Sequence, residues 1–559
     1  MKSNIPFFHR IAVYARRGDA MPENILSKQI NHFLMKRILT RLTALLFGSL
    51  GALQAGELKL PPVFSDHMVL QQDLSIPVWG SASPGDVVSV EFAGQTKTAR
   101  ADATGRWMLR LDKLSASGEA RALVVRAKET LTIVDVLVGE VWLGSGQSNM
   151  AGPMRTFRGN DEGLQKTLAA APYPRIRLIK QGGAGWQLAT AENVDTFSAI
   201  LFAFGSRLHA ELGVPVGLMT GAVGGTPSGY WLTEEMYRSD AACMAQVKEF
   251  AKTYDFASAM NGYERYMIAW KANAEKAKQS GGKVGREPTK PQQPGECVGE
   301  FGHLYAAHVL PYVPYAIRGV LWDQGEGGTG ITGVDQFRVM GALIKGWRKA
   351  WGQDFPFLYM QKPSGGGTAW DLANPTTKNA SPFTALPAKV PADKEGIARE
   401  VHIKIQQQPN TAMVTSTDLG GMTHPVNKSG YADRALLVAK GFVYGQKVEF
   451  SGPLYASHEI VGDKVRIKFT HVGKGLAARH ADKLQGFLIA GEDKKFVWAD
   501  AAIDGDCVVV SSAAIPKPAG VRYAWSSNAP WANLFNQDGL PAQTFRTDDW
   551  DTSPRAARR

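Results

Sequence analysis

Between residues 57 and 136, apolar and polar positions alternate in short runs that are separated by turns containing Pro and Gly. The stretch VLQQDLSIPVWGSASPGDVVSVEFAG is representative, and RALVVRAKETLTIVDVLVGEVWL continues the pattern. A period of two residues is typical of strands that bury one face. The pattern therefore predicts a small β-sandwich domain over residues 57–136, leading directly into the next region.

From residue 137 to 445 the pattern changes to short apolar runs that alternate with helical periods. The predicted strands are VWLGSG, VPVGLMTGA, IRGVLWDQG, FPFLYMQ and TAMVTSTDLG, and helices between them include ILFAFGSRLHAEL and FRVMGALIKGWRKAW. Such alternation favours an α/β fold with a parallel sheet and helices on both faces. Loops at the carboxyl ends of the strands should then carry the chemistry.

Two long insertions interrupt this region, and a further domain follows it. Residues 233–300 predict a helical insertion that ends in a polar loop, and residues 363–397 are rich in Gly, Pro, Thr and Ala. Long loops near strand ends often form lids or substrate walls. Alternating patterns return over residues 446–559 and predict a C-terminal β-domain.

The first 56 residues have the pattern of an N-terminal extension with a signal peptide. Met35-Lys36-Arg37 begins a basic segment, residues 42–53 are mostly apolar, and small residues surround Ala55. The apolar run is too short to cross a bilayer comfortably. We therefore predict cleavage near Ala55 and a periplasmic or secreted protein without a membrane span in the mature chain. The alternative is an amphipathic tail of unknown purpose.

The charge distribution and the cysteine content argue against nucleic-acid binding, a disulfide framework and a metal site. The 559 residues carry a formal charge of +12, but residues 1–55 hold eight Lys and Arg against two acidic residues, which is half of that charge. The remaining chain is mildly basic and has no basic stripe, so nucleic-acid binding is not expected. Three cysteines form no disulfide framework, and no metal-ligand spacing is present, so we expect neither a metal nor a cofactor. The oligomeric state stays open.

Polar and glycine-rich residues follow four of the predicted strands. Ser148 lies in a Gly-flanked turn after VWLGSG, and Gly224-Gly225-Thr226 follows the second strand. Gln324-Gly325-Glu326 follows the third strand, and His424 lies in a loop after the last one. Together they supply a nucleophile, a base, a carboxylate and oxyanion donors, which are the groups needed for acyl transfer.

These segments resemble the sialate O-acetylesterase family of SGNH hydrolases. The matching segments are FSDHMVLQQDLSIPVWGSASPGD, VGEVWLGSGQSNM, GLMTGAVGGT, VLWDQGEGG, DLGGMTHPVNKSGYADR and RYAWSSNAPWANLFNQDGLPAQTFRTD, in this order. The resemblance implies a flavodoxin-like, three-layer SGNH-hydrolase sheet with flanking β-domains. It also implies that Ser148 is the acylated nucleophile and that His424 is its general base and later general acid. The implied oxyanion hole consists of the backbone N–H groups of Ser148 and Gly225 and the side-chain amide of Gln324.

The acid of the implied triad is where the chain departs from the pattern. Many SGNH hydrolases have an Asp three residues before the His, and this chain has Gly421 there. Glu326 is the favoured substitute and Asp418 the second, and a Ser–His dyad whose imidazole is oriented by a backbone carbonyl is the third possibility. Asp323 and Gly327-Gly328 also differ from the usual residues, at positions that bear on specificity.

The resemblance implies hydrolysis of acetyl esters on sugars through an acetyl-serine intermediate, with 9-O-acetylated sialic acid as the first candidate substrate. A deacetylase of acetylxylan or another polysaccharide is the alternative within enzymes. A non-catalytic carbohydrate-binding protein is the alternative of another class.

Overall fold

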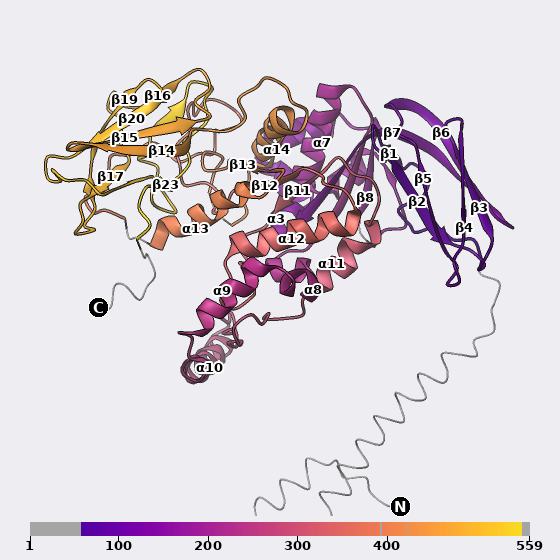
Figure 1. The fold of residues 1–559 in the computed structure, drawn as a ribbon, viewed down its shortest axis with the longest axis horizontal. Coiled ribbons are helices and arrows are strands. Elements are labelled where there is room, and N and C mark those ends of the chain that lie inside the picture. The colour runs from indigo at the N-terminus through magenta and orange to yellow at the C-terminus, as the bar shows by residue number, and fades with distance from the viewer. Residues whose placement is uncertain (1–56, 181, 392–393, 422, 551–559) are drawn as a thin grey trace, which may run out of the picture.

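The computed structural model describes residues 57–180, 182–391, 394–421 and 423–550. The expected signal peptide and its cleavage site lie outside these residues. The chain forms an α/β region that is flanked by β-sheets at both ends, and Figure 1 shows the three parts in a row in chain order. None of the described helices is long and apolar enough to cross a membrane.

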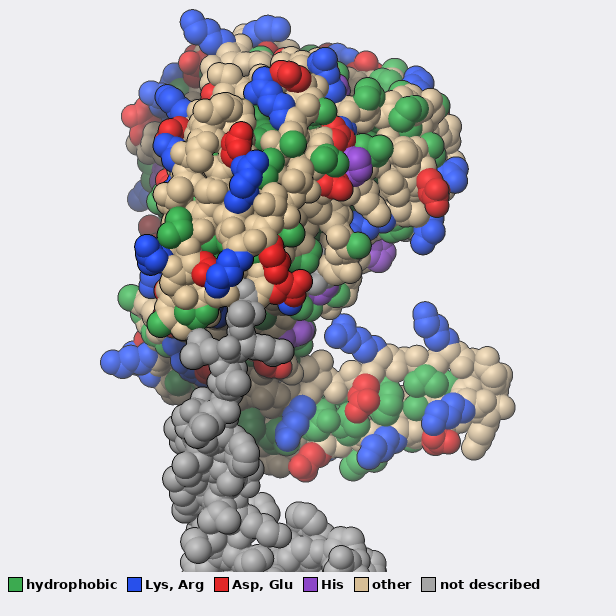
Figure 2. Space-filling model, turned by 90° about the vertical axis from the view of Figure 1, so that its right-hand side faces the viewer, with side chains coloured by type: hydrophobic (Ala, Val, Ile, Leu, Met, Phe, Trp, Pro, Cys, Tyr) green, Lys and Arg blue, Asp and Glu red, His purple; other side chains and the backbone are tan. Residues whose placement is uncertain are grey.

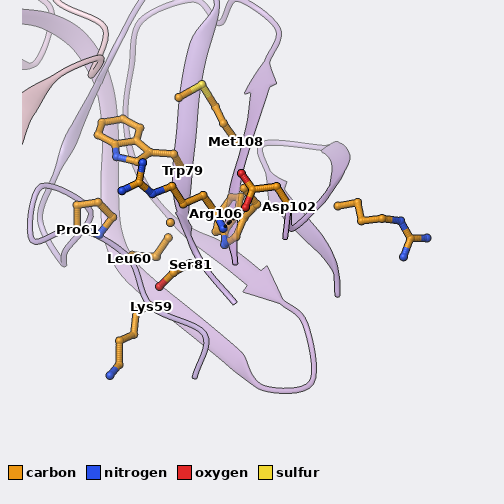
Figure 3. A pocket seen from close by; sticks show the side chains of 11 residues that line it. Lys59, Leu60, Pro61, Trp79, Ser81, Asp102, Arg106 and Met108 are labelled. Carbon is orange, nitrogen blue, oxygen red and sulfur yellow. Dashed lines mark hydrogen bonds between the residues drawn. The ribbon is translucent and has the colours of Figure 1, made fainter. Parts of the chain in front are cut away.

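The first part consists of two small sheets. One contains β1 (Val69–Gln71), β3 (Val87–Phe92), β4 (Gln95–Arg100), β6 (Ser117–Arg126) and the first half of β7 (Thr130–Gly146). The other pairs β2 (Ile76–Ser81) with β5 (Arg106–Leu111) in antiparallel register. Inward-facing residues such as Val78 and Leu111 are fully buried between the sheets. A cavity of about 750 Å³ lies beside β2 and β5. Figure 3 shows the side chains of Trp79, Arg106 and Met108, which line it.

Strand β7 is 17 residues long and continues from the first part into the central sheet. The central order is β13-β12-β11-β7-β10-β8-β9. The strands are β8 (Tyr173–Lys180), β9 (Gln187–Ala189), β10 (Val216–Ala222), β11 (Gly319–Asp323), β12 (Phe357–Met360) and β13 (Thr411–Val414). Numbered along the chain, the six strands that pair in parallel, β8, β10, β7, β11, β12 and β13, lie in the order 2-3-1-4-5-6.

All five predicted central strands are present, and their mutual pairing is parallel as expected. The sheet is nevertheless mixed, because edge strand β9 runs antiparallel to β8. The wholly parallel sheet of the prediction is wrong in this respect. The physical reason is the short connection between the two strands, which allows only a hairpin and no crossover.

Helices cover both faces of the central sheet (Figure 1). Trp142 and Leu321 face a core formed with α7 (Ala199–Leu212) and α14 (Lys428–Val438). Leu143 and Trp322 face the opposite core, to which α12 (Gln336–Trp351) contributes. Because strand residues are buried on both faces, the central strands have continuous apolar sequences.

The segment after β10 forms a helical arm. Its helices are α8 (Glu234–Arg238), α9 (Ala241–Ala251) and α10 (Phe256–Gln279). Figure 2 shows the arm projecting from the body with many charged side chains. The remaining helices are α3 (Ser148–Ala151), α4 (Met154–Phe157), α5 (Glu162–Ala169), α6 (Ala191–Asp195), α11 (His303–His308) and α13 (Lys394–Lys404). Between β12 and α13, the described residues form turns and irregular structure.

The last part contains three small sheets around one apolar core. Its strands are β14 (Leu454–Val461), β15 (Lys464–Thr470), β16 (Leu476–Ala478), β17 (Phe487–Ala490), β18 (Val497–Trp498), β19 (Asp500–Asp504), β20 (Cys507–Ser511), β21 (Gly520–Tyr523), β22 (Leu534–Asn536) and β23 (Phe545–Arg546). The buried guanidinium of Arg399 donates to the carbonyls of Ser526 and Gly365, which ties this part to the loop after β12.

Candidate active site

The turn that carries Ser148 is determined by the close packing of β7 against β11. Gly146 has a φ of +121°, and a Cβ atom at this position would lie 2.2 Å from the carbonyl oxygen of Asp323. Only glycine fits such an approach. The N–H of Gln147 donates to the same carbonyl at 2.8 Å, and helix α3 begins at the next residue. The Ser148 hydroxyl is therefore presented, half-buried, at the carboxyl edge of the sheet.

His424 reaches this turn from the loop between β13 and α14. Its Nε2 atom lies 2.9 Å from the Ser148 Oγ, although the two residues are 276 positions apart in the chain. This is the distance of a hydrogen bond through which an imidazole can take the proton of a hydroxyl. The pairing of these two residues, which the sequence placed at separate strand ends, is present in the structure.

The glycines after β10 lie beside the Ser148 turn. A Cβ atom on Gly224 would lie 3.4 Å from the Cβ of Ser148. Gly225 has a φ of +73°, which favours glycine, and its surroundings are open. Among the described residues, the backbone N–H groups of Ser148 and Gly225 have no acceptor. Two free N–H groups at the end of a sheet can stabilise a developing oxyanion.

The side-chain amide of Gln324, which we predicted to donate to the oxyanion, donates to backbone carbonyls in the structure. Its Nε2 donates to the carbonyls of Gly328 at 2.9 Å and Thr226 at 3.3 Å. Its Oε1 accepts from Ser228 and Gln336. Both amide hydrogens are therefore engaged, and the side chain braces the loop that carries Gly225 against the loop that follows β11.

Glu326 belongs to a cluster of charged groups behind the Ser148 turn. Its Oε1 lies 2.7 Å from the Nζ of Lys362 and accepts a hydrogen bond from the Asn149 amide at 3.2 Å. Lys362 also lies 2.7 Å from Asp323, whose side chain is fully buried. Burial raises the pKa of Asp323 above its ordinary value, although the charge of Lys362 opposes this. Burial would lower the pKa of Lys362, but the two carboxylates outweigh it and raise that pKa.

Asp418, the other predicted acid, makes a different contact. Its carboxylate forms a bidentate, buried ion pair with Arg434 of α14, with distances of 2.8 and 3.2 Å. Within the described part of the chain, neither Asp418 nor Glu326 hydrogen-bonds to His424, and the imidazole Nδ1 has no partner. The structure thus brings Ser148 and His424 together and leaves the acid of the triad unassigned by direct contact.

The chain is similar to known esterases over most of its length. No protein-family model matches it. It is 25% identical to sialate O-acetylesterases of Homo sapiens and Pongo abelii, over 88% of this chain and 92% of each relative. A solved carbohydrate acetylesterase from Xanthomonas citri is 29% identical with a TM-score of 0.66, over 88% of this chain and 100% of that one. The chain is thus similar to sialate O-acetylesterases over most of its length. It is a carboxylic ester hydrolase.

Three polar residues near the Ser148 turn escaped the sequence reasoning. Asn149, Lys362 and Lys428 are nearly inaccessible to solvent, and all three contact the Glu326 cluster or one another. A signal did exist for two of them. Lys362 follows a buried apolar strand, and Lys428 begins the helix after the His424 loop. Both therefore lie at the carboxyl edge of the sheet, where α/β proteins usually carry their chemistry.

No group of three or more His, Cys, Asp or Glu side chains that could hold a metal ion is found among the described residues. Cys243, Cys297 and Cys507 are free thiols, and the first two are buried.

Proposed function

We propose that this chain is a carbohydrate O-acetylesterase that uses Ser148 as its nucleophile. The observation that carries the proposal is the 2.9 Å contact between Ser148 Oγ and His424 Nε2, beside two backbone N–H groups that have no acceptor among the described residues. The relatives and the solved structure support the class of reaction and the SGNH-type fold. An intact nucleophile and base argue against a protein that only binds glycans.

The reaction has two halves. His424 takes the proton of Ser148 as its Oγ attacks the acetyl carbonyl, and the oxyanion is held by the N–H groups of Ser148 and Gly225. The intermediate collapses, the C–O bond to the sugar breaks, and the imidazolium returns the proton to the sugar oxygen. Water then attacks the acetyl-serine with His424 as base, which releases acetate and restores the hydroxyl.

Gln324 is proposed as part of the oxyanion hole through its loop contacts. Its amide holds the carbonyl of Thr226, the residue after Gly225, at 3.3 Å. This hydrogen bond fixes the peptide that follows Thr226 and so restrains the loop that carries the Gly225 N–H. A rotation of the side chain toward the substrate would be needed for direct donation.

Glu326 is the acid that we favour for stabilising the imidazolium. Asn149 donates both to Glu326 at 3.2 Å and to the carbonyl of Thr423 at 3.0 Å, so the carboxylate lies close to the His424 backbone. Both carboxylate oxygens of Asp418 pair with Arg434, whereas Lys362 and Asn149 contact only the Oε1 of Glu326. In this arrangement Glu326 acts through space, and the triad resembles a Ser–His dyad with a nearby negative charge.

We propose 9-O-acetylated sialic acid as the substrate on the strength of the relatives' activity. A deacetylase of acetylated polysaccharides is the second candidate, which the similarity to the carbohydrate acetylesterase favours. Export to the periplasm or medium is proposed from the N-terminal pattern alone.

The test measures acetate release from O-acetylated sialic acid, acetylxylan and p-nitrophenyl acetate. Ser148→Ala and His424→Ala should each lose at least about 10³-fold in kcat on every substrate that the wild type cleaves. A fluorophosphonate probe should label the wild type and the control Ser206→Ala, whose hydroxyl lies in helix α7. Persistent labelling of Ser148→Ala would show that another residue is the nucleophile.

A further inference from the structure

The side chain of Asn149 connects the nucleophile turn to the His424 loop. Asn149 follows Ser148 in helix α3 and is 1% exposed. Its Nδ2 donates to the backbone carbonyl of Thr423 at 3.0 Å and to Glu326 at 3.2 Å. Its Oδ1 accepts a hydrogen bond from the Lys428 ammonium at 2.5 Å. Every polar atom of this side chain is therefore engaged.

Lys428 is an unusual partner for a neutral amide. It is 0% exposed, and its one hydrogen bond to a described residue goes to Asn149. The ammonium lies over the rings of Phe157, at 4.4 Å, and Tyr431, at 5.7 Å. Burial lowers the pKa of Lys428 to about 7. A buried ammonium without a carboxylate in contact opposes folding, so its hydrogen bond to Asn149 calls for a role beyond stability.

The two contacts of Asn149 hold both ends of one short segment. Thr423 immediately precedes His424, and Lys428 begins helix α14 four residues after it. The imidazole itself is exposed, and its Nδ1 has no partner within the described part of the chain. A catalytic histidine is usually oriented by a hydrogen bond to its second nitrogen, and no described residue makes such a bond to His424. Within this part of the chain, the backbone that carries the ring is what orients it.

We infer that Asn149 is a positioning residue, which with Lys428 holds the His424 loop at the distance from Ser148 that proton transfer requires. The inference rests on the proposed function. Ser148 and Asn149 are neighbours in one helical turn. The hydroxyl that gives its proton to His424 and the amide that holds the His424 loop therefore share a rigid backbone. Without the clamp the loop is free to shift, and a displacement of about 1 Å can cost about 10²-fold in rate.

The experiment uses the full chain with Asn149→Ala, Lys428→Met and the double variant. The matched control is Asn533→Ala, because Asn533 is also a fully buried asparagine whose amide donates to two backbone carbonyls, but lies in the last part of the chain. The readouts are kcat and KM on p-nitrophenyl acetate, the rate of fluorophosphonate labelling, and the thermal midpoint. Ser148→Ala is measured alongside.

We expect Asn149→Ala to lower kcat and the labelling rate about 10- to 100-fold while KM changes less than about threefold. Lys428→Met should act in the same direction, and the double variant should be no worse than Asn149→Ala, because both changes break one clamp. Asn533→Ala should lower the thermal midpoint and keep the wild-type kcat.

Asn149→Asp adds a readout that a purely structural role would not move. It puts a negative charge near the imidazole, so the acid limb of the pH–rate profile should move to higher pH. It carries the test by itself if Asn149→Ala does not fold. A kcat of Asn149→Ala within twofold of wild type, an unmoved acid limb in Asn149→Asp, or a double variant equal to the product of the single ones would overturn the inference. An inactive wild type, or an active Ser148→Ala, would instead overturn the proposed function.

Discussion

Replacing Lys362 with methionine should destabilise the central α/β region in a pH-dependent way. The Lys362 side chain is 3% exposed, and its ammonium lies 2.7 Å from both Asp323 and Glu326. Methionine fills a similar volume without the charge. The Glu326 side chain is 23% exposed and can recover water, whereas Asp323 is fully buried and cannot. Removing one member of a buried ion pair costs about 3–5 kcal/mol, and we expect a loss in this range at pH 8.

The pH dependence follows from Asp323. Its pKa is raised by burial even in the wild type, and without Lys362 it should rise further. The folded variant then binds a proton that the unfolded chain releases, so its stability falls as the pH rises from the ordinary range of aspartate toward the raised pKa. The defect of Lys362→Met should therefore be smaller at pH 5 than at pH 8.

Urea unfolding at the two pH values measures this difference. Lys440→Met is the matched control, since the Lys440–Glu211 pair is partly exposed at 23% and 29% and should contribute about 0–1 kcal/mol. Adding Asp323→Asn to Lys362→Met should restore much of the lost stability, because the buried charge of Asp323, which has lost its partner, is then removed. A loss below about 1 kcal/mol at pH 8, or a defect that grows toward pH 5, would refute the reasoning.

Three further variants test other parts of the site. Gly146→Ala should lower kcat/KM by at least about 10²-fold, because its Cβ would lie 2.2 Å from a carbonyl oxygen of β11; wild-type activity would contradict this packing argument. Asp418→Asn should lower the free energy of unfolding by about 3 kcal/mol and keep kcat within about tenfold of wild type. Glu326→Gln should instead lower kcat by more than about tenfold and change the free energy of unfolding by less than about 3 kcal/mol. A fall in kcat near 10⁴-fold in Asp418→Asn would make Asp418 the triad acid. Lys428, whose pKa burial lowers to about 7, binds a proton more readily when unfolded, so wild-type stability should rise from pH 7 to 10. The free energy of unfolding, measured in urea titrations, should rise by at most about 1.4 kcal/mol per pH unit from this source. Lys428→Met should make this pH dependence smaller, and an unchanged pH dependence would exclude Lys428 as its source.

The periodicity of apolar residues was sufficient to predict the central strands and their parallel pairing. Runs such as VWLGSG and FPFLYMQ are buried on both faces, and only strands in the middle of a helix-covered sheet need such sequences. Since parallel strands end at one edge, the sequence also indicated that Ser148 and His424 would meet. Strands β8 and β9 were both missed. Arginine residues interrupt the apolar run of β8, and β9 has only three residues with mostly exposed side chains, so both strands carry little periodic signal.

The partners of the polar side chains were decided by the tertiary structure. The sequence offered Glu326 as the favoured acid and Asp418 as the second. In the structure Asp418 faces Arg434 of α14, and Glu326 faces Lys362 and Asn149. Hydrogen bonds and ion pairs depend on direction over about 3 Å and on burial, and neither can be read from the order of residues. The sequence by itself determined which chemical groups gather at the edge of the sheet. Their pairing into a nucleophile with its base, a braced glutamine and a buried charge cluster arose only from the packing of β7, β11, β12 and α14.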